Sequence, residues 1–257
     1  MIHPIGRILT HTPSKQSPSI PEIKINTMTE NGHKDDQNNK PSSSPNPGYV
    51  FVTGKVTDPQ KFGPNYAAKI PATLVPFGGT FLFKCMVPSV AYNEVANFEN
   101  AVCLKFPSVQ HALDWETSAD YDALKPIRDE TSDLNAFVIL EGGNKAVANK
   151  SSDSDEKSKK GYLIATAKVT NGELLKKEYS SKVGATIEAF GGTFVVKGAA
   201  KTAAFNKQTG DPFDMVAIIE FPSVDKAIEW HSSDEYQALV DARNKATDAL
   251  SFLVFEG

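Results

Sequence analysis

Cysteine is scarce in this sequence, with only Cys85 and Cys103 among 257 residues. Neither stands in a C-x-x-C pair or in a cysteine–histidine cluster, so the ligand spacing of a zinc site is missing and we expect no metal. A disulfide between the two cysteines is open on count alone, but nothing in their spacing favours it. We therefore expect a reducing compartment, which is the cytoplasm.

A large excess of one charge and a long apolar run are also missing. The net charge is −4, from 27 basic and 31 acidic residues, which provides no basic stripe for nucleic acid. No apolar run approaches the length of about 18 residues that a membrane-spanning helix needs. These absences predict a soluble protein with neither nucleic acid nor a membrane as a partner.

Large apolar side chains are few in residues 1–47, which are rich in Pro, Ser, Asn and charge. Such a segment cannot bury enough surface to offset its ordering entropy, so we predict a disordered tail. It lacks the apolar core of a secretory signal. Residues 1–21 are rich in Ser and Thr and contain no acid, so an organellar transit peptide stays an alternative to a cytoplasmic location, as does a start at Met28.

What the sequence does contain is a repeat. The motif FGGTF occurs in "VPFGGTFLFKC" and in "EAFGGTFVVKG", 113 positions apart. Residues 48–84 and 161–197 share 16 identities in 37 positions without a gap. After a two-residue insertion, "FPSV" also recurs, as do a tryptophan, a tyrosine, an arginine and a closing Glu-Gly. The chain is therefore a tandem duplication of one domain.

The repeat sets the domain boundaries. We predict a tail (1–47), a first copy (48–142), a flexible connector (143–160) and a second copy (161–257). The connector is polar, charged and without periodicity. A flexible chain of its length spans roughly 24 Å, which is enough to join the end of one copy to the start of the next.

One copy shows a clear order of elements. "GYLIATAKVT" alternates as a strand does, and an apolar stripe at spacings of three and four then predicts an amphipathic helix, in which Pro71 of the first copy should produce a kink. The glycine pair of FGGTF should end this helix. Two more strands, a helix capped by serines and a last strand follow. The order βαββαβ is the ferredoxin-like split-βαβ motif, and the fold class is α+β.

This order predicts how the copies meet. Both helices cover one face of a four-stranded sheet, and the other face still carries apolar residues, for which we take Phe252, Val254, Ile218 and Val195. That face must be buried, and the same face of the other copy is the economical partner. We expect an intramolecular barrel with the helices outside, in a chain that is a monomer, with a homodimer as the alternative.

Several motifs together carry a family resemblance. "GYLIATAKVT", "EAFGGTFVVKG", "IEFPSVDKAIEWHSSDEYQAL" and the closing "FLVFEG" resemble the domain-of-unknown-function family 1330 of the dimeric α+β barrel superfamily. The resemblance covers both copies, and copy one departs from it at Glu116 and Pro71. It implies a barrel of two domains, usually a homodimer. The superfamily includes cofactor-free monooxygenases, polyketide cyclases, isomerases and haem-degrading enzymes, and often has a cavity between helices and sheet.

His231 is the candidate acid or base for such a cavity, because it continues an apolar helical stripe. Its ordinary alternative is a packed histidine with one backbone hydrogen bond. The equivalent residue in copy one is Glu116, so any chemistry that needs this histidine would exist in copy two alone.

Aromatic and arginine residues complete the candidate site. Tyr179 is the candidate hydrogen-bond donor and Arg243 the candidate anion clamp of a catalytic set with His231. The candidate ligand-binding residues are Trp230, Tyr236, Tyr66, Trp115 and Arg128. The structural alternatives are core packing for the aromatic residues and, for the arginines, ion pairs with nearby acids such as Asp241 or Glu130, or bonds to last-turn carbonyls.

The motifs point to no known cofactor. FGGTF is not a phosphate loop, and no flavin or nicotinamide fingerprint, Ser-His-Asp triad or Cys-His pair is recognisable. We therefore predict a small-molecule-binding or accessory protein for an apolar metabolite, with copy one mainly structural. One alternative is a cofactor-independent cyclase, isomerase or monooxygenase, and a second is a ligand-free interaction or stress-related scaffold.

Overall fold

The computed structural model describes residues 45–85, 89–92, 98–142, 159–209 and 212–257. The predicted tail and connector lie almost entirely outside the described residues. Residues 43–257 form one compact unit that holds both copies. Residues 48–142 are called repeat 1 below, and residues 161–257 repeat 2. The described part of the chain contains no helix that is long and apolar enough to cross a membrane.

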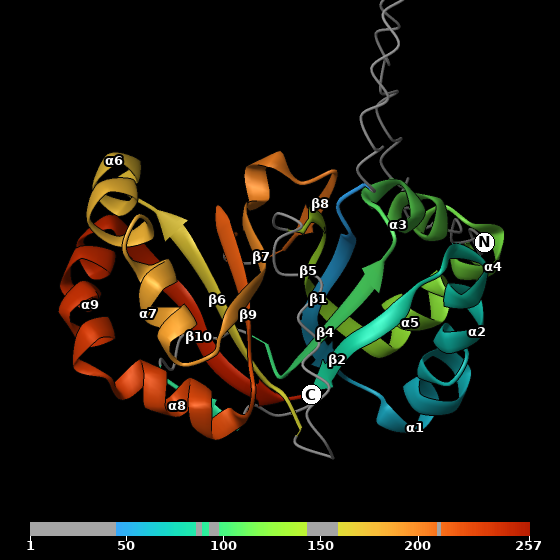
Figure 1. Ribbon diagram of the computed structural model, residues 1–257. Helices are drawn as coiled ribbons and strands as arrows, with labels where there is room; N and C mark the ends of the chain where they lie inside the picture. The colour runs from blue at the N-terminus through green and yellow to red at the C-terminus, as the bar shows by residue number, and fades with distance from the viewer. Residues whose placement is uncertain (1–44, 86–88, 93–97, 143–158, 210–211) are drawn as a thin grey trace, which may run out of the picture. The chain divides into compact units, whose positions relative to one another are not determined.

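Each repeat contains the predicted strands and helices in the predicted order (Figure 1). Repeat 1 consists of β1 (Gly48–Val56), α1 (Pro59–Phe62), the π-helical η1 (Gly63–Ala67), α2 (Ile70–Leu74), the 3-10 turn η2 (Val75–Phe77), β2 (Thr80–Cys85), β3 (Val90–Ala91), β4 (Asn100–Phe106), α3 (Val109–Glu116), α4 (Ala119–Asp122), α5 (Lys125–Thr131) and β5 (Ser132–Glu141). Repeat 2 consists of β6 (Gly161–Val169), α6 (Gly172–Leu174), the π-helical η4 (Leu175–Ser180), α7 (Val183–Ala189), β7 (Thr193–Ala199), the 3-10 turn η5 (Ala200–Thr202), β8 (Phe205–Gln208), β9 (Met215–Phe221), α8 (Val224–Ser232), α9 (Asp234–Ala246) and β10 (Thr247–Glu256).

The two sheets exchange a short edge strand, which the sequence did not predict. One sheet has the order β2-β4-β1-β5-β8 and the other β3-β10-β6-β9-β7. Strand β8 of repeat 2 thus pairs with β5 of repeat 1, and β3 of repeat 1 pairs with β10 of repeat 2. Each exchanged strand covers backbone groups that would otherwise form an open sheet edge.

Three apolar clusters hold the unit together. The largest lies between the two sheets and takes residues from both repeats, among them Phe51, Val138, Ile164 and Phe255. The other two lie between the sheet and the helices of each repeat. In Figure 1 the helices accordingly stand on the outer side of each sheet. The predicted burial of sheet against sheet within one chain is confirmed.

The assignment of faces was wrong for the last strand. Ile218 and Val195 do lie in the cluster between the sheets, but Phe252 and Val254 face the helices, and Leu253 and Phe255 face the partner sheet. Both faces of this strand are apolar, so its sequence alternation contains no signal for the face. A bulge between Ala249 and Ser251 also shifts the register.

The first helix of each repeat is broken, but proline is not the cause. Pro71 lies in the first turn of α2, where its missing N–H costs little. Repeat 2 has Gly184 at this position, and its helix is interrupted at the equivalent place, between η4 and α7. The break therefore belongs to the repeat, with its π-helical turn, and Pro71 merely fits it.

The repeated FGGTF motif is explained by its contact with the repeated FPSV motif. The first glycine has a positive φ in both repeats, +63° for Gly78 and +73° for Gly191, and ends the helix. A Cβ on the second glycine would lie 2.6 Å from the ring of Phe106 in repeat 1 and 2.5 Å from the ring of Phe221 in repeat 2. Both glycines are thus required by backbone conformation and close packing.

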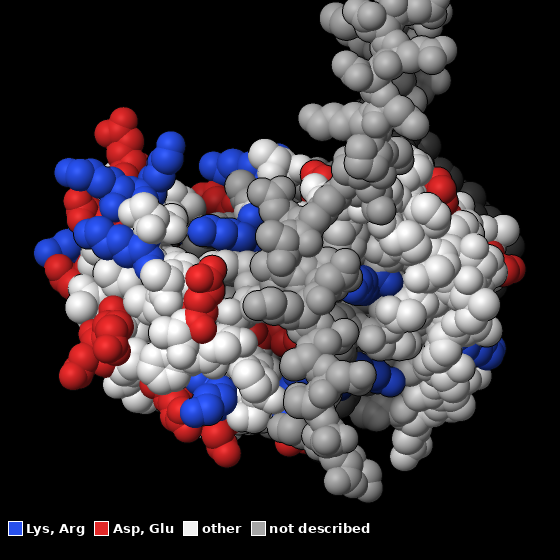
Figure 2. Space-filling model, viewed as in Figure 1, with Lys and Arg blue, Asp and Glu red and all other residues white. Residues whose placement is uncertain are grey.

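Charged side chains of both signs are interspersed on the face shown in Figure 2, many of them over the helices of repeat 2. The described residues that are visible on this face form no stripe of basic side chains of the kind that tracks a phosphate backbone.

Candidate functional site

Each repeat has a cavity between its sheet and its helices. The cavity of repeat 1 has a volume of about 80 Å³ and that of repeat 2 about 50 Å³. They are equivalent places, because Tyr66, Phe81, Lys84 and Arg128 line the first and their counterparts Tyr179, Phe194, Lys197 and Arg243 line the second. Of these two equivalent cavities, that of repeat 1 has the greater volume, although the sequence predicts a mainly structural role for this repeat.

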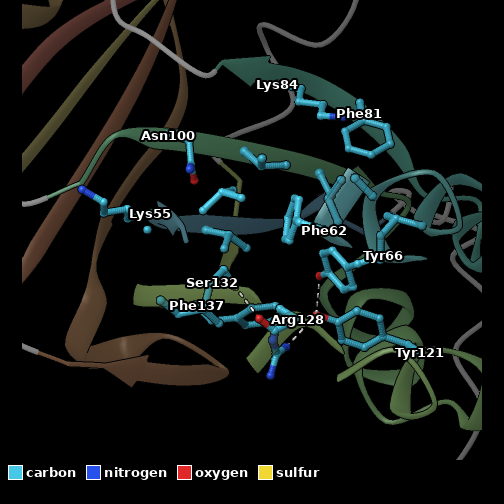
Figure 3. Close-up of a pocket in the computed structure, with 18 of the residues that line it drawn as sticks. Lys55, Phe62, Tyr66, Phe81, Lys84, Asn100, Tyr121, Arg128, Ser132 and Phe137 are labelled. Carbon is cyan, nitrogen blue, oxygen red and sulfur yellow. Dashed lines mark hydrogen bonds between the residues drawn. The ribbon is translucent and has the colours of Figure 1, made fainter. Parts of the chain in front are cut away.

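A chain of polar groups forms one wall of the repeat 1 cavity (Figure 3). Arg128 Nη1 donates to the Tyr121 hydroxyl at 2.9 Å, and that hydroxyl lies 3.3 Å from the hydroxyl of Tyr66. Arg128 is only 6% exposed, and its charge is paired with Asp129, which accepts from Nε at 2.8 Å and from Nη2 at 2.7 Å. A buried guanidinium needs such partners.

The two phenols of this wall are neutral donors. Burial raises the pKa of Tyr66 well above its ordinary value, and the neighbouring Tyr121 acts in the same direction. Burial also raises the pKa of Tyr121, against the opposing effect of Arg128. Both hydroxyls therefore keep their protons at neutral pH and are hydrogen-bond donors.

Helix termini and packing position this wall. Ser108 caps α3 and Ser118 caps α4, so the chain turns sharply between Trp115 and Tyr121. The two rings stack with centroids 4.1 Å apart, and the indole Nε1 donates to the Thr73 hydroxyl at 3.0 Å. The packing against Trp115 thus fixes the position of the Tyr121 ring, whose hydroxyl accepts the hydrogen bond from Arg128.

Repeat 2 has the same wall with a different neighbour for its arginine. Arg243 Nη1 donates to the Tyr236 hydroxyl, and burial, reinforced by Tyr236, raises the pKa of Tyr179 well above its ordinary value. The other Arg243 nitrogens, Nε and Nη2, lie 3.1 and 2.9 Å from Asn244 Oδ1. Among the described residues, no carboxylate pairs with Arg243. Asp241, an expected partner, binds Lys245 instead.

His231 does not line either cavity. Its ring stacks on Tyr92 of repeat 1, with centroids 3.4 Å apart, and lies 5.4 Å from the ring of Phe252. Burial, helped by the charge of Arg243, lowers the pKa of His231 to about 4, so the ring is neutral at pH 7. The structure therefore brings Tyr179 and Arg243 together at one cavity. It places His231 elsewhere, beside Tyr92, which follows the β3 strand that repeat 1 contributes to the sheet of repeat 2.

The equivalent of His231 has a different environment. Glu116 forms an ion pair with Lys125 at 2.8 Å, and Lys125 also donates to the Glu116 carbonyl oxygen at 2.7 Å. These contacts link α3 to α5 and lie outside the residues that line the repeat 1 cavity.

The two tryptophans are core anchors, although one also borders a cavity. Trp115 is 1% exposed and lines the repeat 1 cavity, whereas Trp230 is fully buried and does not line that of repeat 2. Trp230 Nε1 donates to Thr186 as Trp115 does to Thr73. Tyr236 is also fully buried and reaches the repeat 2 wall through its hydroxyl alone.

Sequence reasoning missed three kinds of residue at these sites. Tyr121 is central to the repeat 1 wall, and its match with Tyr236 in the repeat was the available signal. Lys84 and Lys197 follow FGGTF at the same spacing and line the two cavities. Tyr92 lies in a segment with little resemblance between the copies, so no sequence signal indicated it. Within the described part of the chain, no group of three or more His, Cys, Asp or Glu side chains is placed to hold a metal ion.

Comparison with solved structures gives several similar folds at low identity. A protein of unknown function from Rhodopseudomonas palustris is 20% identical, with a TM-score of 0.33, and the match covers 40% of this chain and 85% of that one. A chlorite dismutase variant from Candidatus Nitrospira defluvii is 8% identical, with a TM-score of 0.46 and coverage of 82% and 91%. An anthrone oxidase-like protein is 9% identical, with a TM-score of 0.44 and coverage of 84% and 94%.

Comparison at the level of sequence is more specific. No curated protein sequence matches the chain. The family model described as Domain of unknown function (DUF1330) matches it twice, over residues 47–142 and 160–257. The chain therefore belongs to the DUF1330 family, as a tandem duplication of its domain that forms an α+β barrel.

Proposed function

We propose that this protein binds a small, largely apolar molecule that has one hydrogen-bond acceptor, and that the cavity of repeat 1 is the main site. The observation that supports this most directly is the chain Arg128–Tyr121–Tyr66 along one wall of an otherwise mostly apolar cavity. Apolar walls with a few placed polar groups are typical of small-molecule sites.

The direction of the donors supports an acceptor on the ligand. A guanidinium has donors only, so the Tyr121 oxygen accepts from Arg128. The Tyr121 proton is then available for the Tyr66 oxygen, 3.3 Å away. When Tyr121 donates in this pair, the Tyr66 proton is left for a group in the cavity, and a carbonyl oxygen would accept it. Asp129 compensates the charge of Arg128, so this wall favours a neutral acceptor, and the exposed Lys84 lines the cavity away from the wall.

The size of the cavity limits the ligand. A volume of about 80 Å³ corresponds to roughly five to eight water positions, at 10–15 Å³ for each. A single ring or a short branched chain fills such a space. Phe81, 37% exposed, lies at its edge, where a longer ligand would extend.

Binding is favoured over catalysis by the chemistry of the lining. Among the described residues that line either cavity there is no carboxylate and no imidazole, which are the side chains that most often act as general bases. The alternative of a cofactor-independent enzyme relied on His231, which lies outside the repeat 2 cavity. The alternative of a ligand-free scaffold would be favoured by a closed core with no cavity beside His231. His231 lines neither cavity, but each repeat has a cavity between its sheet and its helices.

The chain's two tryptophans, one in each repeat, allow a test that separates the sites. We would label them as 5-fluorotryptophan and titrate the full chain with acetophenone or with ethylbenzene, which lacks the carbonyl. Acetophenone should shift the Trp115 fluorine signal, and Tyr66→Phe should weaken its binding about three- to tenfold, which corresponds to one hydrogen bond. Ethylbenzene binding should not change.

Tyr179→Phe is the matched control, because it removes the equivalent hydroxyl from repeat 2 and should leave the Trp115 titration as it was. Absence of any Trp115 shift with either probe at millimolar concentration would reject the proposal.

We also propose that the chain is a monomer whose repeats serve as each other's partner. The exchanged strands and the shared apolar cluster support this. Native mass spectrometry of the full chain should give the mass of one chain, whereas a mass of two chains would contradict it. A cytoplasmic location remains a prediction from the sequence.

A further inference from the structure

The two cavities differ in charge, although they share the same wall. The residue after the wall arginine is Asp129 in repeat 1 and Asn244 in repeat 2. Asp129 neutralises Arg128 through two contacts, whereas Arg243 makes the same kind of contacts with a neutral amide oxygen. The positive charge of Arg243 therefore has no compensating carboxylate in the part of the chain that the structure describes.

A second cation lines the repeat 2 cavity. The ammonium of Lys197 lies 4.8 Å from the centroid of the Phe194 ring and 3.4 Å from the Ser180 carbonyl oxygen. Among the described residues it pairs with no carboxylate; the nearby Asp214 instead pairs with Lys201, at 3.1 Å. Lys84 of repeat 1 likewise pairs with no carboxylate among the described residues, so the charge difference between the cavities comes from Arg243, beside a cavity whose described lining contains no acid.

Hydroxyl groups extend the polar part of this cavity. Thr166 Oγ1 and Ser251 Oγ lie 2.6 Å apart, and both residues are buried in its lining. The rest of the lining is mainly apolar, including Val183, Ile187 and Phe252. The lining of the cavity therefore combines cationic and hydroxyl groups with an apolar surface.

We propose that the repeat 2 cavity is a second, distinct binding site that takes a small carboxylate attached to an apolar or aromatic group. The carboxylate replaces Asn244 as the partner of the Arg243 guanidinium, whose planar fork matches two carboxylate oxygens. Lys197 adds a second cationic contact. The inference rests on the proposed function, because it names the ligand class of a cavity equivalent to the one proposed above.

The chain supplies its own matched test. Asn244→Asp gives repeat 2 the compensating carboxylate of repeat 1, and Asp129→Asn gives repeat 1 the neutral amide of repeat 2. Both side chains are on the exposed surface of their helices. Benzoate and benzamide are matched probes, since they have nearly the same shape and differ in charge at pH 7. The Trp230 ring packs on Phe252, which lines the cavity, so its fluorine signal reports on repeat 2.

In the unaltered chain, the Trp230 signal should give a dissociation constant for benzoate about tenfold below that for benzamide, because hydrogen bonds to charged groups are the stronger ones. The Trp115 signal should show no preference for benzoate. Asn244→Asp should abolish the preference at Trp230, and Asp129→Asn should create one at Trp115. The positions of both fluorine signals without probe verify that each variant is folded.

Equal affinity of the two probes at Trp230, or a benzoate preference that survives Asn244→Asp, would overturn the inference and leave the proposed function standing. If acetophenone, benzamide and benzoate all leave both signals unmoved, the proposed function itself fails, and this inference fails with it.

Discussion

The cavities of repeat 1 and repeat 2 have the same arginine–tyrosine–tyrosine wall, but only one of them compensates its arginine. Asp129 and Asn244 are the difference. In a homodimer of single domains, symmetry gives both sites the same residues. A tandem duplication removes that restriction, so one copy can keep an arginine that is paired with a carboxylate while the other keeps an arginine that is not.

The two repeats also differ at the strand crossings, the places where β3 or β8 of one repeat pairs with the sheet of the other. Tyr92 follows β3 and stacks on His231, and its N–H donates to the Phe252 carbonyl oxygen. At the equivalent crossing, Lys207 of β8 lies opposite Phe137, and Glu116 stands where repeat 2 has His231. The first crossing contains the titratable His231 in an aromatic stack. At the second, Phe205 of β8 packs edge-on against Phe137, and the largely buried Glu116 is paired with Lys125. The two ends of the molecule should therefore respond differently to substitution and to pH.

The largest effect should come from truncating the tryptophans. Trp115→Ala and Trp230→Ala should each lower the free energy of unfolding by about 3–5 kcal/mol, as is typical of buried aromatic residues. Trp115 borders the repeat 1 cavity, whereas Trp230 borders neither of the two equivalent cavities, which predicts the smaller loss for Trp115→Ala. Urea unfolding of the two variants measures both values. A larger loss for Trp115→Ala would contradict the placement of the main cavity in repeat 1.

The second effect is a pH dependence that belongs to repeat 2. The pKa of His231 is lowered to about 4, whereas an unfolded histidine has a pKa of about 6.5. As the pH falls from about 6.5 to about 4, the unfolded chain binds a proton that folded His231 does not. The free energy of unfolding therefore falls in this window, by about 2 kcal/mol, and does not depend on this group above it.

His231→Gln should remove that part of the pH dependence, as measured by urea unfolding at several pH values. His111→Gln is the matched control, because His111 is exposed on the equivalent helix of repeat 1, and it should leave the dependence intact. An unchanged pH profile in His231→Gln would show that the ring is not held neutral by the Tyr92 stack.

A third comparison concerns the arginine partners. Asp129→Asn should lower the free energy of unfolding by about 1–2 kcal/mol, since it leaves the buried charge of Arg128 without its carboxylate. Asn244→Ala should cost less than about 1 kcal/mol, because Arg243 is more exposed and loses a neutral partner only. Thermal unfolding of the two variants gives the difference, and equal losses would mean that Asp129 does not compensate Arg128.

Most of the fold could be predicted from the sequence because residues that are identical in the two copies mark contacts that both copies need. The identities around FGGTF and FPSV specify a close glycine–phenylalanine contact that both repeats need. The order of elements and the burial of sheet against sheet followed from apolar periodicity. The exchanged strands β3 and β8 did not, since each is short and pairs with a distant segment, so no local pattern indicates its partner.

The candidate site was predicted only in part, because spacing along a helix was the signal that identified its residues. Tyr66, Arg128 and their counterparts in repeat 2 were identified because they lie on helices at repeated spacings. His231 was assigned to the cavity because its spacing continues an apolar stripe, but that stripe meets Tyr92 of the other repeat there. Spacing shows which face of a helix is buried, and only the tertiary structure shows what covers it.

The smallest effect should come from the Tyr92 hydroxyl, which is buried without a hydrogen-bond partner among the described residues. Such a group keeps its desolvation cost, so Tyr92→Phe should raise the free energy of unfolding by up to about 1 kcal/mol while it preserves the stack with His231. Tyr92→Leu, which removes the stack, should lower it. Urea unfolding at pH 7 distinguishes the two. A loss of stability in Tyr92→Phe would mean that the hydroxyl has a partner, and the crossing at repeat 2 would then be polar as well as aromatic.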